Sequence, residues 1–261
     1  EQERYLQIAN EIKSKRNIEG IRLSTRPDYI NLEKLELLKK YNVTTIELGT
    51  QSMDENVLKM SGRGHTVSQS VEAAKRIKEY GFELGLQMMI GLPGDSLEKS
   101  LYTANQICKL QADSTRIYPL LVIKETHLHK MFMEGKYQPL SLEEAVLWSK
   151  EVYKIFEKNN VEIIRVGLHP SEGLLNGEDL IAGPFHLSFR ELVLTELWKD
   201  ELQNKLDNNF HEIEIFVNPT QINFAVGYNS KNKNWLMSKF KKVKFGFDTK
   251  LKNREFYVNY C

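Results

Sequence analysis

Hydrophobic residues recur along this chain in two alternating patterns. Short apolar runs rich in β-branched and aromatic residues predict strands at 21–25, 44–48, 82–90, 115–122 and 161–166. Apolar residues three and four positions apart predict helices at 5–12, 32–40, 67–80, 97–110 and 142–158. The predicted strands are nearly continuous apolar runs, as expected when both faces of a sheet are covered. Alternating strands and helices pair in parallel, so we expect an α/β fold with a curved or barrel-like parallel sheet.

The pattern changes after residue 166. Glycine-containing loops at 167–173 and 182–186 precede a predicted helix at 188–206. Predicted strands follow at 211–217, 221–228 and 255–258, around a short helix at 235–240. We therefore expect two regions: a parallel α/β part over residues 1–166, and a small α+β extension over residues 167–261.

The extension carries a basic segment at 231–254. Its cationic residues are Lys231, Lys233, Lys239, Lys241, Lys242, Lys244, Lys250, Lys252 and Arg254. Trp235, Phe240 and Phe245 lie among them. A lysine-rich segment of this kind is either a solvated surface or a patch that contacts RNA.

Composition limits the class of protein. The 261 residues are 41% hydrophobic and 27% charged, with a net charge of +1, which is typical of a soluble globular protein without overall attraction to nucleic acid. No apolar run approaches the roughly 20 residues of a membrane span. The two cysteines, Cys108 and Cys261, exclude a disulfide framework and a cysteine-only metal site, so a reducing cytoplasm is expected. The chain begins at Glu1 inside a helical pattern, which predicts a piece of a longer protein.

Polar residues concentrate where the predicted strands end. Gln51 follows the strand at 44–48, and Arg63, flanked by Gly62 and Gly64, lies just before His65. Ligands of parallel α/β proteins bind at the carboxyl ends of the strands. This stretch therefore places an amide, a guanidinium and an imidazole near a ligand site.

Further polar residues lie on or beside the other strands. Glu47 and Gln87 lie within strands, where each needs either a buried partner or a polar ligand. Gly91-Leu-Pro-Gly94 follows the strand of Gln87 and serves either a ligand or only the turn. Arg26, held extended by Pro27, pairs either with an anion or with Asp28 or Glu47.

Other chemistries have weaker support. His127 and His129 are two residues apart and do not share a helix face, and no nucleophile or phosphate-loop motif is present. Cys108 falls on an apolar helix stripe and is expected in the core. His169 and His186, each beside a proline, either line one pocket or form local hydrogen bonds.

Taken in order, four segments resemble a known family. Residues 21–28, 46–52, 63–66 and 87–94 resemble the second half of the core of the radical S-adenosylmethionine (SAM) superfamily. The similarity is to the branch of the Elongator catalytic subunit and the oxygen-independent coproporphyrinogen III oxidases. Residues 168–172 and 182–189 resemble the segment after the core in bacterial Elongator-like proteins. The resemblance implies a partial (βα)6 barrel of the TIM type, with SAM across the carboxyl ends of its strands.

The resemblance also implies roles for individual residues. Gln51 and Gln87 would approach the ribose hydroxyls of SAM, Arg63 its carboxylate, and Gly91 and Pro93 its adenine. Amides hydrogen-bond hydroxyls and a guanidinium pairs with a carboxylate, so the residue types suit these roles. Ser24 stands where this branch usually has a glutamate, and a hydroxyl there can still hydrogen-bond SAM.

One departure is larger. Radical SAM chemistry needs a CxxxCxxC loop, whose three thiolates hold a [4Fe–4S] cluster, and this sequence has none. We expect the first two strands and the cluster loop to precede Glu1 in a full-length protein, which would also need an electron donor. The chain alone would have no radical activity, and the strand at 21–25 would be an exposed sheet edge.

Two classes of function remain open. The first is part of a radical SAM enzyme acting on a tRNA base or a porphyrin-like molecule, with possible tRNA contact through the basic segment. No acetyltransferase domain is recognisable here, unlike in Elongator catalytic subunits. The second is a non-catalytic module that binds RNA or a protein partner.

Overall fold

The computed structural model describes residues 2–207 and 209–260, which form two compact units that divide after Phe185. The sequence patterns place the boundary at residue 166 instead. The difference arises because β7 (Leu180–Ala182) pairs antiparallel with β5 (Val122–Ile123), which keeps residues 167–185 in the first unit. No described helix is both long and apolar enough to cross a membrane.

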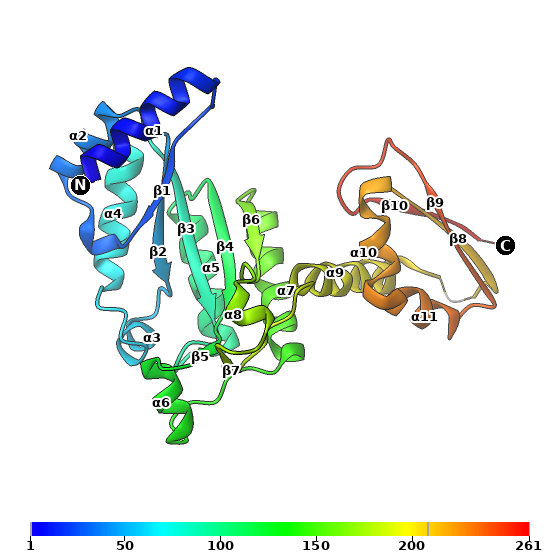
Figure 1. The fold of residues 1–261 in the computed structure, drawn as a ribbon. Helices are drawn as coiled ribbons and strands as arrows, with labels where there is room; N and C mark the ends of the chain where they lie inside the picture. Colours follow the sequence, from blue (N-terminus) through cyan, green and yellow to red (C-terminus); the bar gives the residue numbers. More distant parts are fainter. Residues whose placement is uncertain (1, 208, 261) are drawn as a thin grey trace. The chain divides into compact units, whose positions relative to one another are not determined.

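The first unit is built on a five-stranded parallel sheet in the order β1-β2-β3-β4-β6 (Figure 1). Its strands are β1 (Arg22–Thr25), β2 (Thr45–Gln51), β3 (Glu83–Ile90), β4 (Ser114–Pro119) and β6 (Glu162–Val166). The predicted parallel α/β fold is therefore confirmed, with β1 at one edge. The apolar run predicted as one strand over 115–122 is divided between β4 and β5.

Helices connect these strands. They are α1 (Gln2–Arg16), α2 (Leu32–Lys40), α3 (Glu55–Met60), α4 (Val67–Glu79), α5 (Leu97–Lys109), α6 (His127–Met133), α7 (Leu142–Lys158) and α8 (Glu172–Leu175), with a 3-10 turn at Pro27–Tyr29. The longer ones begin where their sequences supply caps. Thr66 with Gln69, and Ser141 with Glu144, form capping boxes that satisfy the first backbone N–H groups.

The two faces of this sheet differ. Helices α4, α5 and α7 cover one face and bury its apolar side chains, among them Ile46, Leu48, Leu84, Leu86 and Ile117. Strand residues in register point to the same side, so the opposite face carries Glu47, Gln87 and Arg116. The expectation that both strand faces are apolar is therefore wrong, and the polar face is called the inner face below.

The second unit packs helices on one side of a three-stranded sheet. Its elements are α9 (Phe189–Lys205), β8 (Glu212–Val217), α10 (Ile222–Val226), α11 (Lys231–Met237), β9 (Lys242–Phe247) and β10 (Phe256–Tyr260), with 3-10 turns at Pro219–Gln221 and Tyr228–Ser230. Strand β8 is central, antiparallel to β10 and parallel to β9. Trp198, Leu202, Ile215 and Leu236 are fully buried in its core.

Two sequence predictions in this unit are wrong. Residues 221–228, predicted as a strand, form α10 and its flanking turns, because Ile222, Ala225 and Val226 follow helical spacing after the Asn218–Pro219 start. Strand β9 was not predicted, since its alternating lysines lie within the basic segment. Val243 and Phe245 alternate with those lysines and pack on the core.

Candidate functional site

The site begins with a strained turn at the carboxyl end of β2. The Ser52 N–H donates to the Thr50 carbonyl at 2.8 Å, two residues back, and Gln51 between them has φ +65°. A γ-turn with positive φ is rare and strained, and such strain is concentrated at functional sites. Gly49 makes room for the Gln51 side chain, because a Cβ on Gly49 would lie 2.7 Å from Gln51 Nε2.

The next loop is anchored from both sides. The Met53 N–H donates to Thr103 Oγ1 on α5 at 3.0 Å, and Asp54 accepts from the Val57 N–H to cap α3. After α3 the chain turns back through Gly62 and Gly64, which have φ +64° and +73°. Glycine adopts this left-handed conformation without the Cβ penalty. The loop therefore returns Arg63 and His65 to the end of β2.

Arg26 holds the returning loop in place. Its guanidinium forms two hydrogen bonds of 2.9 Å with the Asp28 carboxylate and a third of 3.1 Å with the Gly64 carbonyl. This pairing holds the pKa of Asp28 below its usual value. Of the roles considered for Arg26, the structure supports the pairing with Asp28.

Arg63 is a half-buried cation without a carboxylate partner among the described residues. Its Nη2 lies 2.8 Å from Met89 Sδ on β3, and its Nε has no hydrogen-bond partner. Burial lowers the pKa of Arg63, since desolvation disfavours the charged form. A buried guanidinium with free donors is suited to bind an anion.

Three more buried polar atoms in residues 50–65 lack a partner in the described structure. They are Thr50 Oγ1, Gln51 Oε1 and His65 Nδ1. His65 is 7% exposed, and its Nε2 donates to the Thr50 carbonyl at 3.1 Å. A carbonyl only accepts, so this bond leaves Nδ1 of a neutral imidazole as an acceptor. Because buried polar groups are normally paired, four unpaired atoms in residues 50–65 mark a site that is completed by a ligand.

Two other predicted residues lie on the inner face. Ser24 on β1 is in register with Glu47, and its side chain is exposed. Gln87 on β3 is half-buried and has no side-chain hydrogen bond within the described part of the chain. Gln87 therefore remains a candidate for ligand binding, because no described protein group hydrogen-bonds its side-chain amide.

Glu47 has a structural explanation instead. Its carboxylate accepts from Arg116 Nε at 2.9 Å and from Arg22 Nη1 at 3.5 Å, while only 3% of its side chain is exposed. The carboxylate crosses β3 at Gly85, where a Cβ would lie 3.0 Å from Glu47 Cγ. Glu47 is therefore shared by two arginines and is not free for a ligand.

Gly91 and Pro93 lie in the turn after β3. The Gly91 N–H donates to Asp95 Oδ2 at 2.9 Å, and its carbonyl accepts from the Tyr137 hydroxyl at 2.7 Å. Burial raises the pKa of Asp95 and that of Tyr137. Pro93 is buried. The backbone N–H and carbonyl of Gly91 therefore bond to other residues of the protein. Gly91 can contribute only the shape of the turn to the predicted adenine contact.

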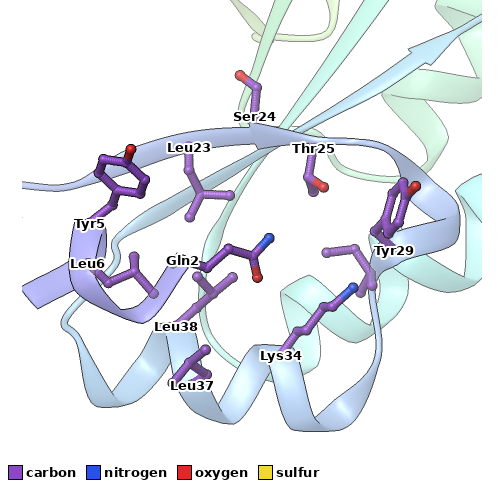
Figure 2. Close-up of a pocket in the computed structure, with 11 residues that line it drawn as sticks. Gln2, Tyr5, Leu6, Leu23, Ser24, Thr25, Tyr29, Lys34, Leu37 and Leu38 are labelled. Carbon is purple, nitrogen blue, oxygen red and sulfur yellow. The ribbon is translucent and has the colours of Figure 1, made fainter.

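A cavity of about 400 Å³ lies elsewhere, between α1, α2 and β1. Figure 2 shows Leu23 and Thr25 pointing into it with Gln2, Tyr5 and Leu38, whereas Ser24 points to the other side of the strand. The cavity is thus on the helix side of the β1 edge. Ser24 also lines this cavity, whereas Gln51, Arg63, Gln87, Gly91 and Pro93 do not.

The remaining candidates lie in other parts of the chain. His169 follows β6 in the first unit, and His186 begins the second unit, where its Nδ1 accepts from the Ser188 N–H at 3.0 Å and its ring meets Tyr228 edge-on. Cys108 on α5 is half-buried, and burial raises the pKa of its thiol. Cys261 lies outside the described residues.

A [4Fe–4S] cluster does not fit the residues present. It needs three thiolates, the sequence has two cysteines, and no group of three or more His, Cys, Asp or Glu in the described residues is arranged to hold a metal. SAM fits the chemistry of the residues present, because buried donor and acceptor atoms of Thr50, Gln51, Arg63 and His65 have no partner in the described structure.

Sequence reasoning missed several contributors. The sequence patterns do not indicate Thr50, Met89 or Arg116, whereas they place the His65 imidazole near a ligand site. Thr50 is adjacent to the predicted Gln51, so its place at the strand end was the available signal. Strand alternation was the signal for Arg116, since it lies two residues before Tyr118 on a strand with buried Ile117 between them.

Comparisons with known proteins agree with this geometry. Residues 2–107 match the model of the radical SAM superfamily, and residues 112–199 match that of the radical SAM C-terminal domain. An uncharacterised protein of Methanocaldococcus jannaschii is 35% identical over 131 residues, covering 49% of this chain and 41% of that protein. The tRNA uridine(34) acetyltransferase of Methanocaldococcus infernus is 34% identical over 127 residues, covering 48% of this chain and 24% of that enzyme.

A solved structure gives the same result. The archaeal Elp3 of Methanocaldococcus infernus with an N-terminal deletion has a TM-score of 0.65 and 28% identity, covering 70% of this chain and 42% of that one. This chain therefore spans less than half the length of these matched proteins.

Proposed function

The chain belongs to the radical SAM superfamily, and we propose that it supplies the SAM-binding half of an Elongator-like enzyme that cleaves SAM reductively. Members of the superfamily bind SAM and a [4Fe–4S] cluster, which supplies the electron for cleavage. The observation that carries the proposal is the set of four unpaired buried polar atoms in Thr50, Gln51, Arg63 and His65.

Each residue has a defined task in this proposal. The Arg63 guanidinium binds the SAM carboxylate, because burial strengthens a charge-assisted hydrogen bond and no carboxylate of the described residues competes. Gln51 and Gln87 hydrogen-bond the ribose hydroxyls, and Ser24 the amino or ribose groups. Gly91 and Pro93 shape the adenine side. These residues bind and orient SAM, while the thiolates for the cluster come from outside these 261 residues.

SAM binding to the 261-residue chain tests the assignment. By titration calorimetry we expect Arg63→Ala and Gln51→Ala each to weaken SAM affinity about tenfold or more, since each removes a bond worth roughly 1.5–3 kcal/mol to a charged or buried group. Arg76→Ala is the matched control, because Arg76 pairs with Glu72 on the surface of α4. Unchanged affinity in both site variants would overturn the assignment of these residues.

The competing function is a non-catalytic module, which the shortage of cysteines favours. The amino-acid sequence of the full-length gene product distinguishes these two functions. If it carries three cysteines spaced CxxxCxxC, reconstitution with iron and sulfide and supply of an electron donor should give 5′-deoxyadenosine from SAM. If the gene product has no such motif and does not cleave SAM, the non-catalytic module is the supported function.

We further propose that the substrate is a tRNA and that the basic segment 231–254 contacts it in the cytoplasm. This segment has nine cationic residues and one acidic residue, Asp248. Lys231 and Lys242 are paired with Glu196 and Glu212. In contrast, Lys241, Lys244, Lys250 and Lys252 form no ion pair with described residues and are exposed. Unpaired lysines are available for phosphates. A porphyrin-like substrate is the alternative.

Filter binding of tRNA at several salt concentrations tests this contact. Replacing the four unpaired lysines by glutamine should weaken binding and reduce the slope of log K against log salt by roughly 3, at about 0.7–0.9 per phosphate contact. The control is the double variant Lys231→Gln, Lys242→Gln, which removes paired charges. Equal effects of the two sets, or none, would contradict a role for this segment.

A further inference from the structure

Two arginines face each other on neighbouring strands of the inner face. Arg116 on β4 is the register partner of Arg165 on β6, and both side chains are half-buried. Like charges directly opposite each other in a sheet are destabilising. The arrangement therefore needs an explanation other than stability.

A local irregularity produces this juxtaposition. Thr115 is opposite Ile163, but the next residue, Arg116, is opposite Arg165, so Ile164 is an extra residue in β6. In regular alternation from Glu162, residue 165 would point to the helix side. The bulge turns Arg165 to the inner face, and bulges of this kind re-aim side chains beside active sites.

The charges around the pair are not balanced. Glu47 is shared by Arg22 and Arg116, and Arg165 forms no ion pair among the residues described. Two other carboxylates of the inner face, Glu83 and Glu162, lie at the amino-terminal ends of their strands. The register row of Arg116 and Arg165 therefore holds two cations and no carboxylate of its own.

A third donor completes the cluster. The Tyr118 hydroxyl accepts from Arg116 Nη1 at 3.2 Å, which leaves its own proton to donate. In the same register row, Gln87 lies beside Arg116 on the side of the SAM residues. Arg165, Arg116 and Tyr118 thus present only donors, next to the proposed SAM site.

We infer that Arg165, Arg116 and Tyr118 form a binding site for an oxyanion of the substrate. The inference rests on the proposed function, because it places the substrate beside SAM on the same face. Guanidinium groups bind phosphate and carboxylate in the same bidentate manner. The oxyanion is therefore either the phosphate of a nucleotide or a substrate carboxylate, held by β4 and β6 while β1 to β3 hold SAM.

Titration calorimetry with three probes tests the site and separates the two sources. The probes are uridine 5′-monophosphate, uridine and citrate. For a phosphate site we expect saturable binding of the nucleotide, none of uridine, and weaker binding of citrate; for a carboxylate site the order of nucleotide and citrate is reversed. Arg165→Gln should weaken the preferred anion at least tenfold, and Arg165→Lys less. Absence of saturable anion binding, or equal affinity in Arg165→Gln, would overturn the inference.

Two further measurements keep this result independent of SAM binding and of folding. Arg165→Gln should leave SAM affinity unchanged, whereas Arg63→Ala should weaken SAM and leave the anion bound. The urea midpoint of Arg165→Gln should equal or exceed that of the unmodified chain, because a repulsive charge is removed. A lowered midpoint would give Arg165 a structural role and contradict the inference, whatever the outcome for SAM.

Discussion

Glu47 on β2 reaches across β3 to Arg116 on β4, and their ion pair is 2.9 Å long. The crossing is possible because the residue of β3 beneath it is Gly85. A side chain there would meet the Glu47 Cγ at 3.0 Å. The ion pair between Glu47 and Arg116 thus links β2 to β4 across Gly85 of β3, on the inner face.

A double-mutant cycle measures this relationship. Gly85→Ala should destabilise the chain by about 1–3 kcal/mol, because the new methyl group overpacks against Glu47. In the Glu47→Ala background the same change should cost less, since the obstructing side chain is gone. Urea denaturation of the four proteins gives the coupling energy. Additive effects would show that Glu47 does not constrain position 85.

The strained Gln51 predicts opposite effects on stability and binding. Gln51→Gly should raise the free energy of unfolding by about 0.5–1 kcal/mol, because glycine adopts positive φ without a Cβ penalty. The same change should weaken SAM binding through loss of the amide. The measurements are denaturation and calorimetry on one preparation. A loss of stability would show that the side chain supports the fold instead.

Gly49 is expected to act through Gln51. A methyl group at position 49 would lie 2.7 Å from Gln51 Nε2, which is closer than van der Waals contact allows. Gly49→Ala should therefore displace the amide and weaken SAM binding, but have little effect in the Gln51→Gly background. Equal losses in both backgrounds would mean that Gly49 serves the strand and not the side chain.

Asp95 predicts a pH dependence of stability. Burial raises its pKa above the ordinary 3.8, against hydrogen bonds from Ser100, Gly91 and Ser96 that lower it. A carboxyl group with a raised pKa in the folded state stabilises the fold most when protonated. This contribution is complete below pH 3.8 and is lost as the pH rises through the raised value.

Asp95→Asn should remove this dependence. The stability of the variant relative to the unmodified chain should increase as the pH rises from 3.8 and become constant above the raised pKa. Urea midpoints at several pH values provide the measurement, with Asp54→Asn as a control carboxylate that caps α3. A difference that decreases with pH would mean that the pKa of Asp95 is lowered.

In the second unit, Gly246 should not tolerate a side chain. A Cβ there would lie 2.5 Å from Phe216, whose ring stacks on Tyr257 at a centroid distance of 4.9 Å. Gly246→Ala should therefore destabilise the chain by about 1–3 kcal/mol, and Phe216→Ala should reduce that cost. Thermal unfolding of the single and double variants tests this. An equal cost in both backgrounds would place the strain elsewhere.

Much of the fold was readable because local signals agreed. The bounds of α2 and α7 match the predicted 32–40 and 142–158, since Asn31 and Ser141 cap apolar periodic segments. The strand predicted over residues 221–228 was wrong, because a short apolar run is compatible with either a strand or a helix. Packing on the core favoured the helix. Strand β9 was missed because the lysines that alternate with Val243 and Phe245 made this stretch look like part of a basic surface segment.

The sequence by itself determined the parallel α/β fold, the family and the order of Gln51, Arg63 and Gln87 on or after predicted strands, because period, caps and motif order are local properties. Only the tertiary structure distinguished between residues of the same type. It paired Glu47 with Arg116 and Arg26 with Asp28. Among the described residues, it gave Gln87 no hydrogen-bond partner and Arg63 no carboxylate. A bulge turned Arg165 toward Arg116. Pairs such as Glu47 with Arg116 form between strands that are far apart in sequence. The distances between such strands cannot be read from the order of the residues.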